Sequence, residues 1–214
     1  MIAKNSDTIN KIVNKKIIKH FKKVDQVLHS VTEKIEALEV WEIKNPDDYF
    51  LELCSNIIGQ QLSGKAADTI YGRFEKLFGK KKINPQNVLK IPDEKLRKAG
   101  MSWSKVKYVK DLAQKVKDRT LKLEKLDNMT DDDVISELTK IKGIGPWTAE
   151  MFLMFTLGRE DVFSNGDLGL RNAIKKLYKF KKEPTRKQIE KIVEKWKPYR
   201  TYASRILWKS LEIK

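Results

Sequence analysis

The stretch of sequence that decides the fold runs from residue 138 to residue 170 and reads LTKIKGIGPWTAEMFLMFTLGREDVFSNGDLGL. Two glycines, Gly143 and Gly145, flank one apolar residue between two helical patterns. Pro146 follows directly, and proline fits the first turn of a helix because its missing N–H costs nothing there. Residues 148–157 then run strongly apolar, as a buried helix would. The stretch therefore predicts a helix, a tight glycine hairpin and a second helix.

The hairpin is a candidate clamp for nucleic acid. A glycine turn that opens a helix exposes unpaired backbone N–H groups and the positive end of the helix dipole, so it can hold a phosphate without a charged side chain. A lone GxG pattern is more often a tight turn between packed helices. The context favours the clamp, because Thr130 to Asp133 form a capping signature and apolar residues follow at helical spacing up to Ile141. No strand pattern precedes the glycines, which argues against a dinucleotide fold or a P-loop.

The composition favours a polyanionic partner and excludes several kinds of site. The 45 Lys and Arg against 29 Asp and Glu give a formal charge of +16, which favours nucleic acid as a partner. An AT-rich genome would also inflate lysine, so the charge alone does not decide. The single cysteine, Cys54, excludes internal disulfides and any four-cysteine zinc or iron–sulfur site. The sequence shows neither a signal peptide nor a membrane span, so we expect a cytoplasmic protein, nucleoid-associated or, in a eukaryote, nuclear.

Helical periodicity runs through the rest of the chain. Residues 6–37 read as a basic amphipathic helix whose apolar stripe we expect to dock on the lobe that follows. Residues 49–58 are almost continuously apolar and read as a buried helix. Further helical patterns cover residues 65–78, 105–119, 166–178, 185–197 and 199–213. Nowhere do four to eight residues alternate convincingly at period two, so the chain is predicted to be all-α.

Four motifs, in this order, carry a resemblance to a known family. They are IIGQQLSGKAA (57–67), KIKGIGPWTAEMFL (140–153), DVFSNGD (161–167) and WKPYRTYASRILW (196–208). Together they resemble the helix-hairpin-helix superfamily of DNA base-excision glycosylases, most closely its 3-methyladenine DNA glycosylase II branch in a short form without the N-terminal β domain. Because four motifs agree in order, the likeness is far more specific than any one of them.

The resemblance implies an architecture of two helical lobes. One lobe is expected to contain residues 1–62 plus 162–214, and the other residues 63–161 with the helix-hairpin-helix motif. An active-site cleft is expected between the lobes. The implied partner is double-stranded DNA that contains damaged bases, and the chain is expected to act as a monomer.

The resemblance also assigns roles to single residues. Asp167 matches the aspartate of the catalytic motif, and the anchor for the DNA backbone matches Gly143, Ile144 and Gly145. The base pocket is implied to contain Trp147, Met151, Leu168 and Trp208. The wedge region that plugs the gap left by the flipped base matches Gln60, Gln61 and Leu62. The resemblance does not indicate which of these three intercalates.

Cofactors are limited to one implied ion. Family members bind an alkali-type cation, Na⁺ or K⁺, through backbone carbonyls of the hairpin, which here are those of Thr139, Ile141 and Ile144. No other cofactor is required. The endonuclease III branch carries a cysteine set for an iron–sulfur cluster, and this chain has one cysteine, so no cluster is expected.

Two departures from the family pattern bear on the reaction. Bifunctional relatives carry a lysine where this chain has Trp147, so the amine needed for a Schiff base is missing and a monofunctional enzyme is expected. Two pocket positions that are aromatic in the enterobacterial enzyme are Met151 and Leu168 here, which affects the substrate range.

Each candidate residue also has a structural interpretation. Asp167 stands where a helix begins, and an N-cap is the commoner use of such an aspartate, although capping and catalysis are compatible. Trp147 and Trp208 lie on apolar helices, where core packing is the more common role.

The sequence-based hypothesis is a monofunctional glycosylase that hydrolyses the N-glycosidic bond of flipped-out cationic purines such as 3-methyladenine and 7-methylguanine. Two alternatives stay open. One is a non-enzymatic helix-hairpin-helix DNA-binding module, against which Asp167 argues because a clamp needs no such carboxylate. The other is a glycosylase for a neutral lesion.

Overall fold

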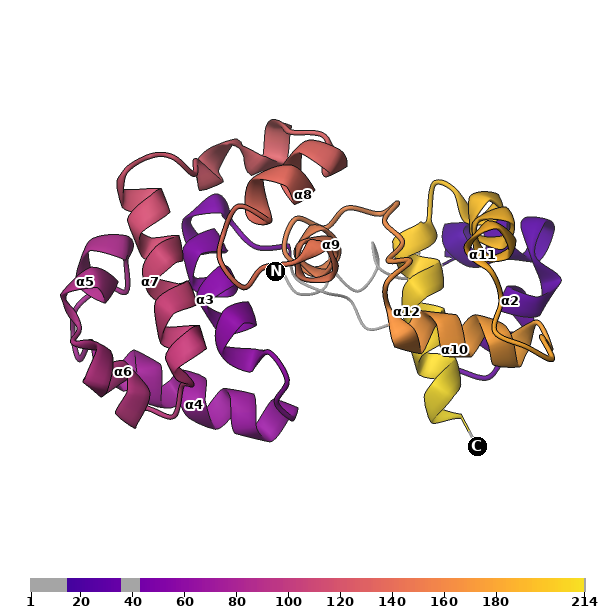
Figure 1. Cartoon of the computed structure of the whole chain (residues 1–214). Helices are drawn as coiled ribbons and strands as arrows, with labels where there is room; N and C mark the ends of the chain where they lie inside the picture. The colour runs from indigo at the N-terminus through magenta and orange to yellow at the C-terminus, as the bar shows by residue number, and fades with distance from the viewer. Residues whose placement is uncertain (1–14, 36–42, 214) are drawn as a thin grey trace, which may run out of the picture. The chain divides into compact units, whose positions relative to one another are not determined.

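The chain is all-helical in the computed structural model, which describes residues 15–35 and 43–213 (Figure 1). No strand occurs among these residues, which confirms the predicted all-α class. The chain divides into two compact units. Unit 1 contains residues 1–42 and 158–214, and unit 2 contains residues 43–157.

Unit 2 is built around α3 and α7, whose apolar faces are buried. Its helices are α3 (Tyr49–Gly59), α4 (Gly64–Lys76), α5 (Pro85–Lys90), α6 (Asp93–Lys98), α7 (Trp103–Lys117), α8 (Asp131–Leu138) and α9 (Pro146–Phe155), with 3-10 turns at Pro46–Asp48 and Leu123–Asn128. α7 packs against α3, α5 and α6, while α8 packs against α9. The apolar run in α3 is buried as predicted, since Leu53 and Ile57 are fully enclosed.

Helix starts in unit 2 follow capping residues in the sequence. The hydroxyl of Ser102 accepts the backbone N–H of Lys105, and that of Thr130 accepts the N–H of Asp133. Pro146 occupies the first turn of α9, as predicted. Each hydroxyl satisfies a backbone N–H that the first helical turn leaves without a partner, which contributes about 1 kcal/mol per cap.

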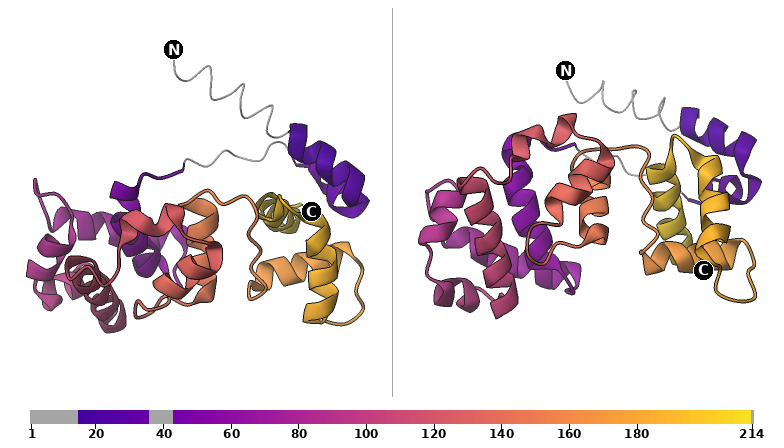
Figure 2. Two further views of the ribbon diagram at one scale, coloured as in Figure 1. Left: turned by 90° about the horizontal axis from the view of Figure 1, so that it is seen from above. Right: turned by 45° about the horizontal axis from the view of Figure 1, so that its top comes forward.

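Unit 1 gathers the two ends of the chain around one core. Residues 15–24 are helical and are followed by α2 (Gln26–Thr32), α10 (Leu168–Leu177), α11 (Arg186–Val193), the 3-10 turn Glu194–Trp196 and α12 (Arg200–Glu212). α12 packs against both α10 and α2 (Figure 2). The core includes Phe21, Leu28 and Trp196, so the apolar stripe of the N-terminal segment is buried there.

The structure corrects the prediction of one continuous helix over residues 6–37. Within the described part of that range, the helix is interrupted at Asp25, whose carboxylate caps α2 by accepting the N–H groups of Val27 and Leu28. The same carboxylate accepts the Tyr178 hydroxyl at 2.5 Å and the Trp196 indole N–H at 2.9 Å. A buried carboxylate needs such partners, and these come from the C-terminal half of the chain.

The two units differ from the predicted lobes in their boundaries. Residues 43–62, predicted in the terminal lobe, belong to unit 2, because α3 packs against α4 and α7. Residues 158–161, predicted in the central lobe, belong to unit 1. There Asp161 forms an ion pair with Arg200 at 2.7 Å. The predicted cleft between the lobes stays a prediction.

Candidate functional site

The glycine hairpin between α8 and α9 depends on the glycine at position 143. Gly143 has a φ of +83°, a backbone conformation that side chains disfavour. A Cβ at this position would lie 2.1 Å from the ring of Tyr108, so the close approach of α7 also requires glycine.

Gly145 has a different role from Gly143, because its φ of −98° suits any residue. A Cβ there would meet nothing within 4 Å. Packing within the chain therefore gives no reason for glycine at position 145. The open space at the N-terminus of α9 suits close approach of an external group to the backbone.

The hairpin is fixed to α7 by a carboxylate. Asp111 accepts the backbone N–H of Lys142 at 3.0 Å, and its other oxygen lies 3.2 Å from the ammonium group of Lys115. Together with the Tyr108 ring under Gly143, this contact holds the hairpin in one conformation. Such preorganisation lowers the entropy that a ligand must remove on binding.

The predicted wedge region, Gln60 to Leu62, forms the turn that ends α3 and is held on two sides. The Gln60 amide donates to the Gly143 carbonyl at 2.8 Å, so its side chain is committed to the hairpin. The ammonium of Lys105 donates to the carbonyls of Ile58 and Gln60 at 2.8 and 2.7 Å, and burial lowers the pKa of this amine. Gln61 has a φ of +57° at the turn, and both Gln61 and Leu62 are exposed.

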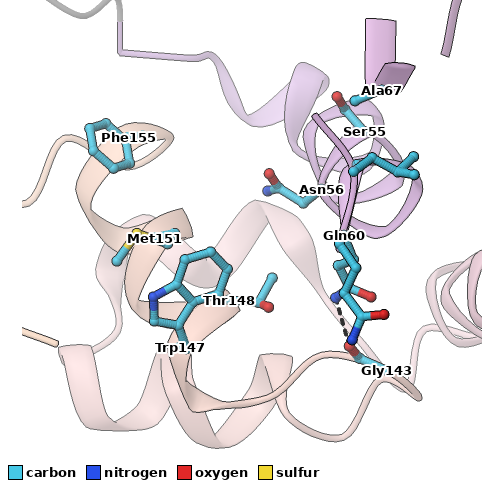
Figure 3. A pocket seen from close by; sticks show the side chains of 12 residues that line it. Ser55, Asn56, Gln60, Ala67, Gly143, Trp147, Thr148, Met151 and Phe155 are labelled. Atoms are coloured by element: carbon cyan, nitrogen blue, oxygen red, sulfur yellow. Dashed lines mark hydrogen bonds between the residues drawn. The ribbon is translucent and has the colours of Figure 1, made fainter. Parts of the chain in front are cut away.

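A pocket of about 710 Å³ lies in unit 2 between α3, the wedge turn and α9 (Figure 3). This volume is in the range of about 300–1,000 Å³ that is usual for small-molecule sites. It is lined by Ser55, Asn56, Gly59, Gln60, Gln61, Leu62, Ala67, Gly143, Trp147, Thr148, Met151 and Phe155. Trp147 is 46% exposed, so core packing does not account for it. The structure thus places two of the four predicted pocket residues, Trp147 and Met151, in one pocket.

Asp167 begins α10 in unit 1 and is 8% exposed. Its Oδ1 accepts the Leu170 backbone N–H at 2.8 Å and the Trp208 indole N–H at 3.1 Å. A Cβ at Gly169 would lie 3.1 Å from that oxygen and 3.2 Å from the Trp208 ring, so glycine makes room for the contact. The N-cap role of Asp167 is confirmed, and the cap holds the carboxylate in one orientation.

The predicted site residues therefore fall into two groups. Asp167, Trp208 and Leu168 belong to unit 1, where Leu168 is 67% exposed. The hairpin, the wedge region, Trp147 and Met151 belong to unit 2.

Sequence reasoning missed two features of unit 2. It did not include Asn56 in the pocket, although Ser55 and Asn56 form a polar pair within an apolar run. It also missed the support that Lys105 and Tyr108 give from α7, for which the sequence holds no evident signal.

Two other classes of site are not found in the described ranges. No group of three His, Cys, Asp or Glu side chains among these residues could hold a metal ion. Within the same part of the chain, no helix is long and apolar enough to cross a membrane.

Cys54 is buried, and burial raises the pKa of its thiol. The cysteine therefore reads as a core residue.

Comparisons with known proteins agree with this geometry. A family model described as HhH-GPD superfamily base excision DNA repair protein matches residues 54–198. A putative DNA-3-methyladenine glycosylase of Bacillus subtilis is 37% identical over 73% of this chain, which spans only 56% of that relative. DNA-3-methyladenine glycosylase 1 of Schizosaccharomyces pombe is 34% identical over 76% of this chain and 72% of its own length.

Two solved structures are similar over nearly the whole chain. The DNA-3-methyladenine glycosidase of Bacillus halodurans has a TM-score of 0.79 and 39% identity, covering 91% of this chain and 88% of that one. The 3-methyladenine DNA glycosylase of Schizosaccharomyces pombe in complex with abasic DNA has a TM-score of 0.74 and 28% identity, covering 92% and 97%.

Proposed function

Because the chain belongs to the HhH-GPD superfamily of base excision DNA repair proteins, we propose that it is a monofunctional DNA glycosylase for alkylated purines. The observation that carries the proposal is the geometry of Asp167, the residue that the motif resemblance implies to be catalytic. The Leu170 N–H and the Trp208 indole hold its carboxylate in a fixed orientation. A plain DNA-binding module needs this aspartate only as a helix cap, for which the Trp208 contact is not required.

The carboxylate of Asp167 is proposed to act on the sugar of the flipped nucleotide. Cleavage of the N-glycosidic bond leaves an oxocarbenium-like sugar, and a fixed carboxylate stabilises the developing positive charge without having to reorient. The same group can orient or deprotonate the attacking water. Water then adds to C1′ while the base departs, so the product is an abasic site in an unbroken strand.

Unit 2 is proposed to supply the contacts that keep the nucleotide out of the duplex. A flipped base costs a few kcal/mol of lost stacking and pairing. Backbone N–H groups beyond the hairpin hold a phosphate at the N-terminus of α9, and the face of Trp147 stacks on the base. Gln61 or Leu62 fills the gap in the duplex, since Gln60 is committed to the hairpin.

We further propose that the hairpin holds Na⁺ or K⁺ through the carbonyls of Thr139, Ile141 and Ile144. Neutral carbonyl oxygens suit an alkali cation, and the Ile141 carbonyl accepts one N–H, from Ile144 at 3.1 Å, which leaves it a second lone pair. The ion would stiffen the turn and add positive charge near the bound phosphate. No cofactor is required for the bond cleavage itself.

The proposed partner is duplex DNA with a damaged base, bound by a monomer in the cytoplasm at the nucleoid, or in the nucleus of a eukaryote. Cationic purines such as 3-methyladenine and 7-methylguanine are the proposed substrates, because ring alkylation makes the base a good leaving group. The electron-rich face of Trp147 also attracts a positively charged ring.

The decisive experiment compares base release by the wild type with that by Asp167→Asn, in single-turnover conditions. Asparagine caps a helix as well as aspartate does, so the variant should keep its fold and DNA affinity while losing far more than tenfold in excision. Asp132→Asn, an exposed first-turn residue of α8, is the charge-matched control. Release of no alkylated base by the wild type, or an Asp167→Asn variant within tenfold of it, would contradict the proposal.

A further inference from the structure

The pocket in unit 2 contains an amide that the proposed reaction has not used. Asn56 lies on α3, in which Leu53, Cys54 and Ile57 are fully buried and Asn56 itself is half-buried. Figure 3 shows its side chain directed from α3 into the space that Trp147 and Met151 line from α9. Among the residues that the structure describes, none forms a hydrogen bond with the Asn56 amide.

An amide in this place affects which base can enter. A base that fills the pocket displaces water from the Asn56 amide, and a polar group that loses water without a new partner is costly. The base that binds best is therefore one whose edge replaces those hydrogen bonds. A pocket with a hydrogen-bonding group rejects the unmatched ligand more strongly than a purely apolar pocket can.

The carboxamide has a defined match among the purines. It presents an acceptor beside a donor, and the N6 amino group and N7 of adenine form the complementary pair. Methylation at N3 leaves this edge of adenine intact. Methylation of guanine at N7 removes the N7 acceptor and leaves only O6, so one of the two hydrogen bonds cannot form. In 1,N6-ethenoadenine the bridged N6 has no hydrogen to donate.

We propose that Asn56 is a specificity-determining residue that reads the N6 and N7 edge of a flipped adenine derivative. It thereby makes 3-methyladenine a better substrate than 7-methylguanine. The inference rests on the proposed glycosylase function and narrows its substrate class. Trp147 supplies stacking to either base, whereas the Asn56 amide distinguishes them.

The test measures two competing substrates in one tube. DNA methylated at both purines is incubated with limiting enzyme, and the released 3-methyladenine and 7-methylguanine are quantified by chromatography and corrected for spontaneous loss. The ratio of the two rates, each divided by its base's abundance, does not depend on the fraction of active protein. A variant that folds poorly therefore still reports on specificity.

Asn56→Leu keeps the approximate size of the side chain and removes both hydrogen-bonding groups. We expect the ratio to fall about fivefold, since 3-methyladenine loses one hydrogen bond more than 7-methylguanine does and one hydrogen bond gives roughly that discrimination. Asn56→Asp keeps the shape and an acceptor for the N6 amino group, but it removes the donor that N7 of adenine and O6 of guanine both need, so the ratio should stay close to that of the wild type. Asn128→Leu makes the same chemical change at an exposed position after α7 and should leave the ratio unchanged.

Failure of this inference can be told apart from failure of the function. A wild type that releases neither base would sink the glycosylase proposal itself. A wild type that releases both bases, with a ratio that stays within twofold in Asn56→Leu, would overturn the role of Asn56 alone. A fall in the ratio in Asn56→Leu that is absent in Asn56→Asp and in Asn128→Leu supports it.

Discussion

At the scale of single residues, one oxygen atom carries two functions. Oδ1 of Asp167 caps α10 through the Leu170 N–H and also accepts the Trp208 indole N–H. Gly169 permits this arrangement, because a larger residue would press on both partners. The sequence motif therefore specifies a helix start, a carboxylate orientation and a space for an aromatic ring at once.

The hydrogen bond from Trp208 to Asp167 should contribute to the rate. Trp208→Phe keeps an aromatic ring and removes the N–H donor, so we expect single-turnover excision to fall about tenfold, which corresponds to about 1.4 kcal/mol. Stability should change little, because the Leu170 N–H still fixes the cap. Trp103→Phe alters a tryptophan that is 51% exposed and serves as the control. Unchanged excision by Trp208→Phe would show that this hydrogen bond has no part in positioning the carboxylate.

The two hairpin glycines should separate stability from DNA binding. At Gly145 an added methyl group meets open space, so Gly145→Ala should have the same melting temperature as the wild type. It should weaken DNA binding equally for every duplex sequence. Gly143→Ala forces a left-handed backbone and a clash with Tyr108, so it should lower the melting temperature markedly. Thermal melts and a salt titration of DNA affinity measure both. Equal affinity of Gly145→Ala and the wild type at every salt concentration would refute a backbone clamp at this position.

At the scale of secondary-structure elements, α7 supports the hairpin and the wedge turn together. Tyr108 and Asp111 contact the hairpin, while the Lys105 ammonium holds the carbonyls that end α3. The Gln60 amide joins the two supported segments directly. One helix thus fixes the two parts of unit 2 that are proposed to contact DNA.

This brace can be tested with two lysines of the same helix. Lys105→Met and Lys110→Met each remove an ammonium that donates to two backbone carbonyls, at the end of α3 and around the end of α5 respectively. Both should lower the free energy of unfolding by about 1 kcal/mol. Only Lys105→Met should also weaken binding to lesion-containing duplex, measured by fluorescence anisotropy. The same loss of affinity in both variants would show a general effect of charge instead.

How far the sequence predicts these elements depends on the range of the contacts involved. Capping at Thr130, the proline at the start of α9 and the buried run of α3 are local patterns, and the structure confirms them. The break at Asp25 depends on Tyr178 and Trp196, which lie more than 150 residues away in sequence. Periodicity shows that a helix has an apolar face without showing which helix covers it. The resemblance implied the terminal lobe for residues 43–62, but α3 packs against α4 and α7 in unit 2.

For the candidate site, as for the helices, the sequence predicts local features but not long-range contacts. Trp147 and Met151 line one pocket, and the contact of Trp208 with Asp167 brings two more candidates together, while their roles stay predictions. The sequence Gln60-Gln61-Leu62 does not show that Gln60 binds the hairpin. Only the folded hairpin provides the Gly143 carbonyl that the Gln60 amide binds. Asn56 was missed because periodicity cannot show that a polar residue in an apolar helix faces a cavity.

At the scale of the whole molecule, the formal charge of +16 favours binding to DNA. The 45 lysines and arginines give a long-range attraction that salt weakens. A chain this rich in lysine also carries many amines that could attack an abasic site. Whether one of them does so depends on position, because a Schiff base forms only when a neutral amine reaches C1′ of the sugar.

The final prediction is that this protein leaves an intact abasic site and forms no covalent adduct with DNA. Trp147 occupies the position of the lysine in bifunctional relatives, and its indole cannot form a Schiff base. Lys105 is the amine at the wedge turn, and its ammonium is engaged by two carbonyls. We expect no trapped band when borohydride is added during turnover, while alkali treatment of the product still cleaves the strand. A trapped adduct that maps to Lys105 or to any other lysine would place the protein among the bifunctional enzymes.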